Sequence, residues 1–132
     1  MMIKTQPNSP EFLTHKRTVL VVAPILPGKA EAWRRFMQEM GGSRRGEYEE
    51  SRHRLGIRAE WAWISETRRR TLGIIIIEAD HPEQTLADLA TSDHPFDRWF
   101  REQLLTLQGF DLTRPDPALL PDLVFAWQSD EG

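Results

Sequence analysis

The chain of 132 residues has the length of one domain and can bury a single hydrophobic core. Its 17 basic and 20 acidic side chains give a net charge of -3, so no overall positive field would attract nucleic acid or anionic lipid. The absence of cysteine excludes disulfides and thiolate metal sites.

The first residues predict a flexible arm followed by one domain. Residues 1–16 contain the sequence PNSP at positions 7–10 and show no apolar period, so the folded domain is expected to span residues 17–132. Residues 18–26 (TVLVVAPIL) imitate the apolar core of a signal peptide, but they are too short to span a membrane. No small-residue cleavage site follows them. We therefore expect a cytoplasmic protein with no membrane segment.

The first half of the domain predicts a strand and a split helix. β-Branched residues are frequent from Arg17 to Ile25, which favours a strand. Apolar side chains at three- and four-residue steps between Ala30 and Met40 predict a helix that Gly41 and Gly42 end. Ser43 then has the side chain to cap a second, highly charged helical piece that continues to Leu55.

A hairpin follows the split helix. The residues from Ile57 to Ile64 alternate with a period of two, which puts Trp61 and Trp63 on the same strand face as Ile57 and Ala59. After the polar residues 65–70, Leu72 to Ala79 form a continuous aliphatic strand.

The second half of the domain predicts two more helices and a last strand. Each helix begins at an Asp-His-Pro tripeptide, at residues 80–82 and 93–95, because proline fits the first helical position. His81 and His94 are then capping positions, and Gly109 ends the second helix. The apolar residues from Asp122 to Gln128 (DLVFAWQ) are expected to form the final strand.

This order of elements predicts an α+β domain of the ferredoxin-like class, βαββαβ. Right-handed crossovers would place both split helices on one face of a four-stranded antiparallel sheet, with the first and third strands inside. The uncovered face would carry about four large aliphatic side chains, worth roughly 6 to 12 kcal/mol when buried. Association costs an estimated 4 to 15 kcal/mol, so aromatic side chains are needed as well. We expect a homodimer through this sheet face.

Three segments resemble one protein superfamily: LPGKAEAWRRF (Leu26 to Phe36), EYEESRHRLGI (Glu47 to Ile57) and SDHPFDRWFREQ (Ser92 to Gln103). They are similar to the dimeric α+β barrel superfamily and, within it, to a bacterial family of unknown function. The resemblance implies a ligand cavity between sheet and helices. Its haem-degrading branch uses an Asn, and the single Asn of this chain is Asn8, in the expected arm. We therefore do not expect haem degradation.

Several aromatic and titratable side chains are candidates to line such a cavity. The set consists of Tyr48, His53, Trp61, Trp63, His94 and Trp99. For Trp61 and Trp63 the alternative is core or dimer packing, and for His94 the alternative is a structural role at a helix entry. Glu49 and His53 lie one helical turn apart, but no third metal ligand accompanies them at a recognisable spacing, so we expect a solvated helix face and no metal.

No motif in the chain identifies a catalytic residue. The leading hypothesis is a dimer that binds a small molecule and needs no cofactor, with activity similar to a cofactor-independent monooxygenase or an isomerase. The alternative is a non-catalytic assembly module whose sheet face serves only dimerisation.

Overall fold

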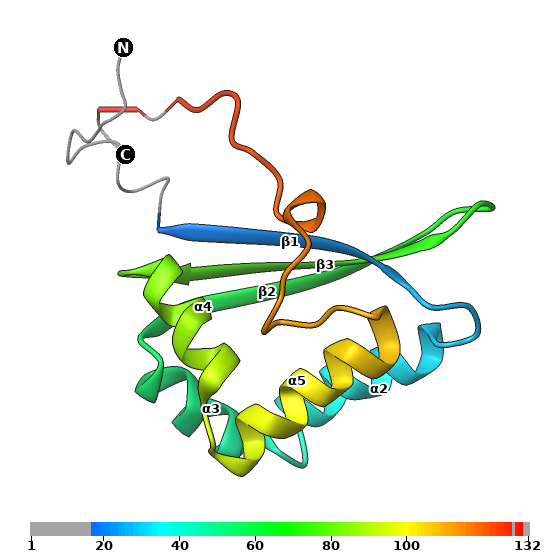
Figure 1. The fold of residues 1–132 in the computed structure, drawn as a ribbon, viewed down its shortest axis with the longest axis horizontal. Helices are drawn as coiled ribbons and strands as arrows, with labels where there is room; N and C mark the ends of the chain where they lie inside the picture. Colours follow the sequence, from blue (N-terminus) through cyan, green and yellow to red (C-terminus); the bar gives the residue numbers. More distant parts are fainter. Residues whose placement is uncertain (1–16, 128, 131–132) are drawn as a thin grey trace.

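The computed structural model describes residues 17–127, 129 and 130, and the arm expected at residues 1–16 lies outside them. The described residues form a three-stranded antiparallel sheet with four α-helices on one of its faces (Figure 1). The elements follow in the order β1 (Thr18–Ile25), α2 (Ala30–Gly41), α3 (Arg45–Arg54), β2 (Ile57–Glu66), β3 (Thr71–Ala79), α4 (Pro82–Thr91), α5 (Pro95–Gln108) and a short 3-10 helix, η2 (Pro117–Leu119). None of these helices combines the length and apolarity needed to cross a bilayer.

The sheet order is β1-β3-β2, so β3 is its central strand. Both neighbours run antiparallel to β3, as the predicted hairpin requires. The strand expected from Asp122 to Gln128 is not formed in the described residues: Asp122 to Trp127 belong to no strand, and Gln128 lies outside the description. As a result β1, which was expected to be an inner strand, lies at an edge of the sheet.

A β-bulge changes the faces of β2. The pairing shifts between Ile57 and Ala59, so Ile57 opposes Ala79 while Ala59 opposes Glu78. Ile57 is therefore buried on the helix side of the sheet, although strict alternation placed it with Trp61 and Trp63. The extra residue lets β2 present both Ile57 and Glu60 to the helices.

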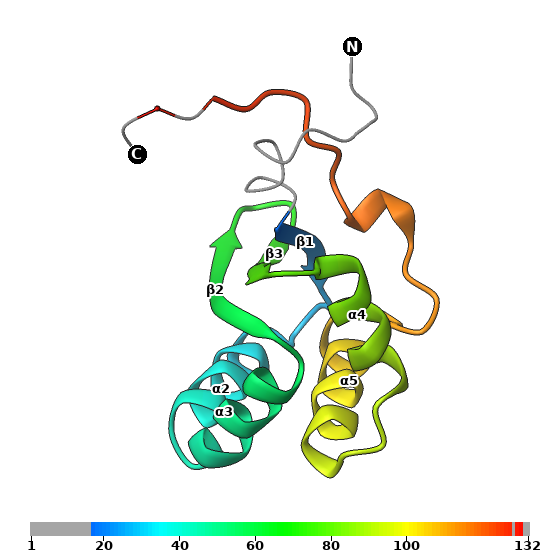
Figure 2. The same ribbon diagram turned by 90° about the vertical axis from the view of Figure 1, so that its left-hand side faces the viewer.

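The helix boundaries agree closely with the sequence pattern. His81 and His94 are the N-cap residues of α4 and α5, each followed by proline, and Gly109 ends α5 with a left-handed φ of 61°. The one departure is at α3, where the N-cap is Arg44 and makes no side-chain capping bond, so Ser43 does not cap this helix. Figure 2 shows the α2–α3 pair beside the α4–α5 pair beneath the sheet.

Small residues in β1 and β3 make room for a buried polar pair. Trp33 donates from Nε1 to Oε1 of Gln108 at 3.1 Å, and Gln108 donates from Nε2 to the Ala23 carbonyl at 2.9 Å. Gly73 lies opposite Ala23 in the register, directly under both side chains. The indole N–H of Trp33 and the side-chain amide of Gln108 thus both have hydrogen-bond partners, and these bonds join α2, α5 and the sheet.

The other face of the sheet is apolar, and no α-helix of the described residues covers it. Rows of the register bring together Leu20, Ile76 and Trp61, and in the next row Val22, Ile74 and Trp63. We call these six residues the open face. Trp61 and Trp63 keep 48% and 49% of their surface exposed. Apolar area of this extent is uncommon on a monomer.

We expect Gly73→Ala to destabilise the fold by about 1 to 3 kcal/mol, the usual cost of overpacking. A Cβ at this position would lie 2.5 Å from Nε2 of Gln108 and 3.0 Å from the Trp33 ring. Urea unfolding measures the change. Gly46→Ala in α3 is the matched control, because its Cβ would meet nothing within 4 Å, and it should be neutral or slightly stabilising. Equal stability of the two variants would contradict this account.

Candidate functional site

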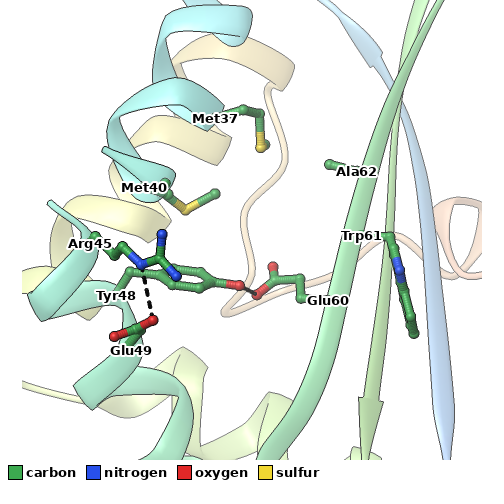
Figure 3. Close-up of a pocket in the computed structure, with 9 residues that line it drawn as sticks. Met37, Met40, Arg45, Tyr48, Glu49, Glu60, Trp61 and Ala62 are labelled. Atoms are coloured by element: carbon green, nitrogen blue, oxygen red, sulfur yellow. Dashed lines mark hydrogen bonds and ion pairs between the residues drawn. The ribbon is translucent and has the colours of Figure 1, made fainter. Parts of the chain in front are cut away.

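A cavity of about 380 Å³ opens between α2, α3 and β2, within the size range of small-molecule pockets. Helix α2 contributes two methionines, α3 a tyrosine and a charged pair, and β2 a carboxylate (Figure 3). The lining residues are Met37, Met40, Gly41, Arg45, Tyr48, Glu49, Glu60, Trp61 and Ala62.

Helix α3 reaches the sheet through a narrow stripe of inward-facing residues. Tyr48, Ser51, Arg52 and Leu55 recur at three- and four-residue steps, and the other positions of the helix are mostly charged. Two members of this stripe meet Glu60 of β2. Tyr48 donates from its hydroxyl to Oε1 of Glu60 at 2.7 Å, and Arg52 donates from Nε to the same oxygen at 2.9 Å.

The Arg52–Glu60 ion pair is buried, with side chains only 5% and 6% exposed. The Arg52 guanidinium also lies over aromatic rings, 4.7 Å from the Tyr48 centroid and 4.5 Å from that of Phe100. Removing two charges from water costs several kcal/mol, which the attraction between them repays only when the remaining hydrogen-bonding groups are also satisfied. Oε2 of Glu60 has only a long contact of 3.4 Å to Arg52, so it retains capacity to accept a further hydrogen bond.

The environment of Tyr48 keeps its hydroxyl protonated. Burial raises the pKa of Tyr48 above its ordinary value, and the neighbouring Glu60 carboxylate raises it further. Arg52 acts in the opposite direction without reversing the shift. Tyr48 therefore enters the site as a neutral phenol that donates a hydrogen bond.

A second buried network fixes the inner side of α3. Asp97, fully buried in the first turn of α5, accepts hydrogen bonds from Ser51 at 2.5 Å, Ser92 at 2.5 Å and Arg54 at 2.7 Å. Burial by itself raises the pKa of Asp97, but these three donors outweigh it and hold the pKa below the usual range. Because Arg52 donates to Ser51 at 3.0 Å, this network continues into the ion pair.

The upper part of the cavity has a different chemistry from its floor. Met37 and Met40 form a soft apolar wall facing Ala62, as Figure 3 shows. At the mouth, Arg45 and Glu49 form an exposed ion pair at 3.1 Å. The arrangement can hold a compact apolar group against the methionines and a hydrogen-bond donor at Glu60.

The structure separates the six candidate residues that the sequence suggested. Tyr48 lines the cavity, and Trp61 borders it, although its ring points to the other side of β2 (Figure 3). Trp63 lies on the open face, and His53 and His94 are exposed on α3 and at the start of α5.

Trp99 lies outside the cavity lining, in an aromatic cluster of the core. Its ring centroid is 5.3 Å from both Phe36 and Phe96, and the Arg44 guanidinium lies 4.2 Å from the ring. These contacts give Trp99 a packing role beside α3.

Sequence reasoning missed Arg52, Glu60 and Asp97, the three charged residues on which the site depends. One signal was available. Glu60 is a carboxylate in a strand position flanked at two-residue spacing by Ala62 and Ile64, which indicates a buried charge with a partner elsewhere in the chain. Within the described residues, no three His, Asp or Glu side chains come together in a group that could hold a metal ion.

The pKa of Tyr48 is directly measurable, because it is the single tyrosine of the chain. We expect the tyrosinate absorbance near 295 nm to develop above the free value of about 10. A raised pKa means that this contribution to stability is complete below pH 10 and is lost as the pH rises beyond it. Glu60→Gln should lower the Tyr48 pKa relative to the parent chain, and an unshifted titration in the folded protein would contradict the buried hydrogen bond.

No protein-family model matches the sequence, and no curated protein matches it either. The site is therefore interpreted from its own geometry.

Proposed function

We propose that the protein binds a small, largely apolar molecule that carries a hydrogen-bond donor, in the cavity between α2, α3 and β2. The observation that carries the proposal is the buried Arg52–Glu60 pair, joined by the Tyr48 hydroxyl, at the floor of a 380 Å³ cavity. Buried ionisable groups in a concave site are more frequent at functional sites than in ordinary cores.

The position of the ion pair carries an energetic cost. An apolar side chain at residue 60 would pack against the core at lower cost than a buried carboxylate that needs an arginine and a tyrosine to satisfy it. Recognition of a ligand in the cavity would account for a charged group at this position. A hydroxyl, amine or ring N–H of the ligand would donate to Oε2 of Glu60, while the methionines contact the apolar part of the ligand.

The resemblance to the dimeric α+β barrel superfamily, which includes cofactor-free monooxygenases and sugar mutarotases, adds a chemical proposal. We propose that a reaction at this site would begin with removal of a proton from the substrate, and that Glu60, the carboxylate at the cavity floor, would accept it. Its Oε1 already accepts two hydrogen bonds, which makes Oε2 the atom for this role. Binding is the primary function, and proton transfer would follow from it.

The proposal includes a homodimer formed through the open face. Two such faces, each with four aliphatic side chains and two tryptophans, would cover one another in a dimeric α+β barrel. In this assembly the segment from Asp122 to Trp127 would supply the fourth strand of a ferredoxin-like sheet. The second candidate function, a non-catalytic assembly module, rests on the same exposed face and predicts a dimer whose cavity takes up no ligand.

Ligand binding is tested with 2-naphthol as the probe and 2-methoxynaphthalene, which lacks the donor, as its partner. We expect 2-naphthol to bind at least about tenfold more tightly, because the ether leaves Glu60 without a donor. At a hundred times its dissociation constant, 2-naphthol should add about 2.7 kcal/mol to stability. It should also shift the methyl signals of Met37 and Met40 in protein labelled at methionine methyl groups, assigned through Met37→Leu and Met40→Leu.

A variant that fills the cavity tests whether the ligand binds there. Ala62→Phe places a ring between β2 and Met37 and should abolish the thermal shift and the methyl perturbation, whereas Ala62→Ser leaves the space open and should retain both. Equal binding by the two variants would move the ligand to another site. Absence of binding by any donor-bearing aromatic compound, in a stable dimer, would favour the assembly module.

Dimerisation is tested by sedimentation equilibrium. The parent chain should be a dimer at micromolar concentration, and Trp63→Glu should be monomeric, because it would bury a carboxylate with no partner in the interface. Arg69→Glu, at the exposed hairpin connection between β2 and β3, is the control and should leave the dimer intact. A parent chain that is monomeric under these conditions would refute the dimer.

A further inference from the structure

We propose that the segment from Asp122 to Trp127 is exchanged between two copies of the chain, each segment pairing with the free edge of β1 in the other copy. This inference rests on the proposed dimer and adds a second, separable contact to it. It assigns a binding partner to the part of the structure that has the most exposed apolar surface.

The segment is apolar, extended and uncovered. Leu123, Val124, Phe125 and Trp127 are 66%, 92%, 79% and 75% exposed, and the chain leaves the body of the protein in both views (Figures 1 and 2). Its residues favour strands, and every second side chain is large: Leu123, Phe125 and Trp127. Such a segment is stable when another strand edge and another apolar surface receive it.

The free edge of β1 is suited to receive a strand. In the described residues β1 pairs only with β3, so its other edge has unpaired backbone groups. Both faces of β1 are apolar, with Val21 and Ala23 toward the helices and Leu20 and Val22 on the open face. The outer edge of β2, by contrast, has a bulge and two exposed charged residues, Arg58 and Glu66, which discourage pairing.

An apolar cavity lies beside the same strand. Its volume is about 330 Å³, and its lining includes Val21 of β1, Leu86 and Ala90 of α4, and Phe110 and Leu112 after α5. A strand added at the edge of β1 would direct alternate side chains into this space and the others onto the open face. The cavity therefore provides the volume that one set of segment side chains needs.

The exposed area fits an interface between two copies. Aromatic side chains bury about 150 to 250 Å² each, so Phe125 and Trp127 at three-quarters exposure offer roughly 250 to 400 Å² per chain. The half-exposed Trp61 and Trp63 add roughly 150 to 250 Å². Together they supply about half or more of the 800 Å² per partner that a standard interface buries. The open face and the segment are therefore expected to act jointly.

A second copy is the occupant rather than the same chain. Helix η2 contacts β1, and Leu119 and Leu120 pack against the core, so the chain enters the segment beside its own β1. From there it turns away from β1 instead of pairing with it (Figure 1). In a face-to-face dimer the segment would extend toward the side from which the partner approaches. Each copy would then receive the segment of the other, and the two exchanged contacts would be related by two-fold symmetry.

Photocrosslinking in mixed-isotope dimers tests the exchange. Phe125 is replaced by p-benzoylphenylalanine, a similar aromatic side chain, and this chain is mixed with excess ¹⁵N-labelled parent protein before illumination. The expected product joins the unlabelled segment to a ¹⁵N-labelled peptide from β1 or from the cavity-lining part of α4. Crosslinks only to the chain's own β1 would overturn exchange in favour of an intramolecular fourth strand. If no crosslink forms to a peptide of β1 or α4, the segment does not pair with β1 and the proposal is wrong.

Truncation separates this inference from the dimer itself. A chain ending at Leu120 should dimerise at least about tenfold more weakly by sedimentation equilibrium, and a chain ending at Ser129 is the matched control and should dimerise as the parent does. An unchanged dimer in the Leu120 truncation would overturn the exchange while leaving the face-to-face dimer in place. A monomeric parent chain would overturn both proposals.

Discussion

The buried ion pair between Arg52 and Glu60 ties the helices to the sheet where the cavity forms. A charged pair in an apolar interface needs partners for most of its donors and acceptors, so it constrains the positions of its neighbours. Tyr48 and Ser51 supply two of those partners, and the Phe100 ring covers the guanidinium. Helix α3 has little other apolar surface with which to hold its place.

Asp97 extends the hydrogen-bond network from α3 to the α4–α5 pair. This carboxylate lies at the start of α5, where the helix dipole favours negative charge, and it joins α3 to the turn before α5. The floor of the cavity is thus held from both sides, by β2 through Glu60 and by α5 through Asp97. A rigid floor below an adaptable methionine wall is an arrangement that fixes one polar group of a ligand and tolerates variation in the rest.

Much of the fold was predictable, because it follows from local patterns. Periodicity located the helices and the hairpin, and the two Asp-His-Pro tripeptides marked the N-caps of α4 and α5. The strand expected near Phe125 has the right residue types but pairs with no strand in the described residues, and strand propensity cannot reveal whether a partner edge is present. The bulge at Ile57 was also invisible, since one extra residue leaves no mark in composition.

The site was predictable only in part. The aromatic pattern indicated Tyr48 and the β2 tryptophans as candidates. The sheet face on which the Trp61 side chain lies depends, however, on the bulge and on which face the helices cover. The Arg52–Glu60 and Asp97–Ser51 contacts join residues that are 8 and 46 positions apart. Contacts of that kind follow from the packing of α3 against the sheet and α5, which a single sequence does not specify.

The bulge in β2 determines which side chains of this strand lie on each face of the sheet. Because side chains alternate along a strand, pairing β2 with β3 without the bulge, with all its residues kept, would turn either Ile57 to the open face or every β2 residue from Ala59 onward to the opposite face. In the second case Glu60 would lie on the open face and Trp61 would point toward the cavity. The orientations of the cavity carboxylate and of the open-face tryptophans therefore both depend on this bulge, and its loss with Arg58 retained would change both surfaces at once.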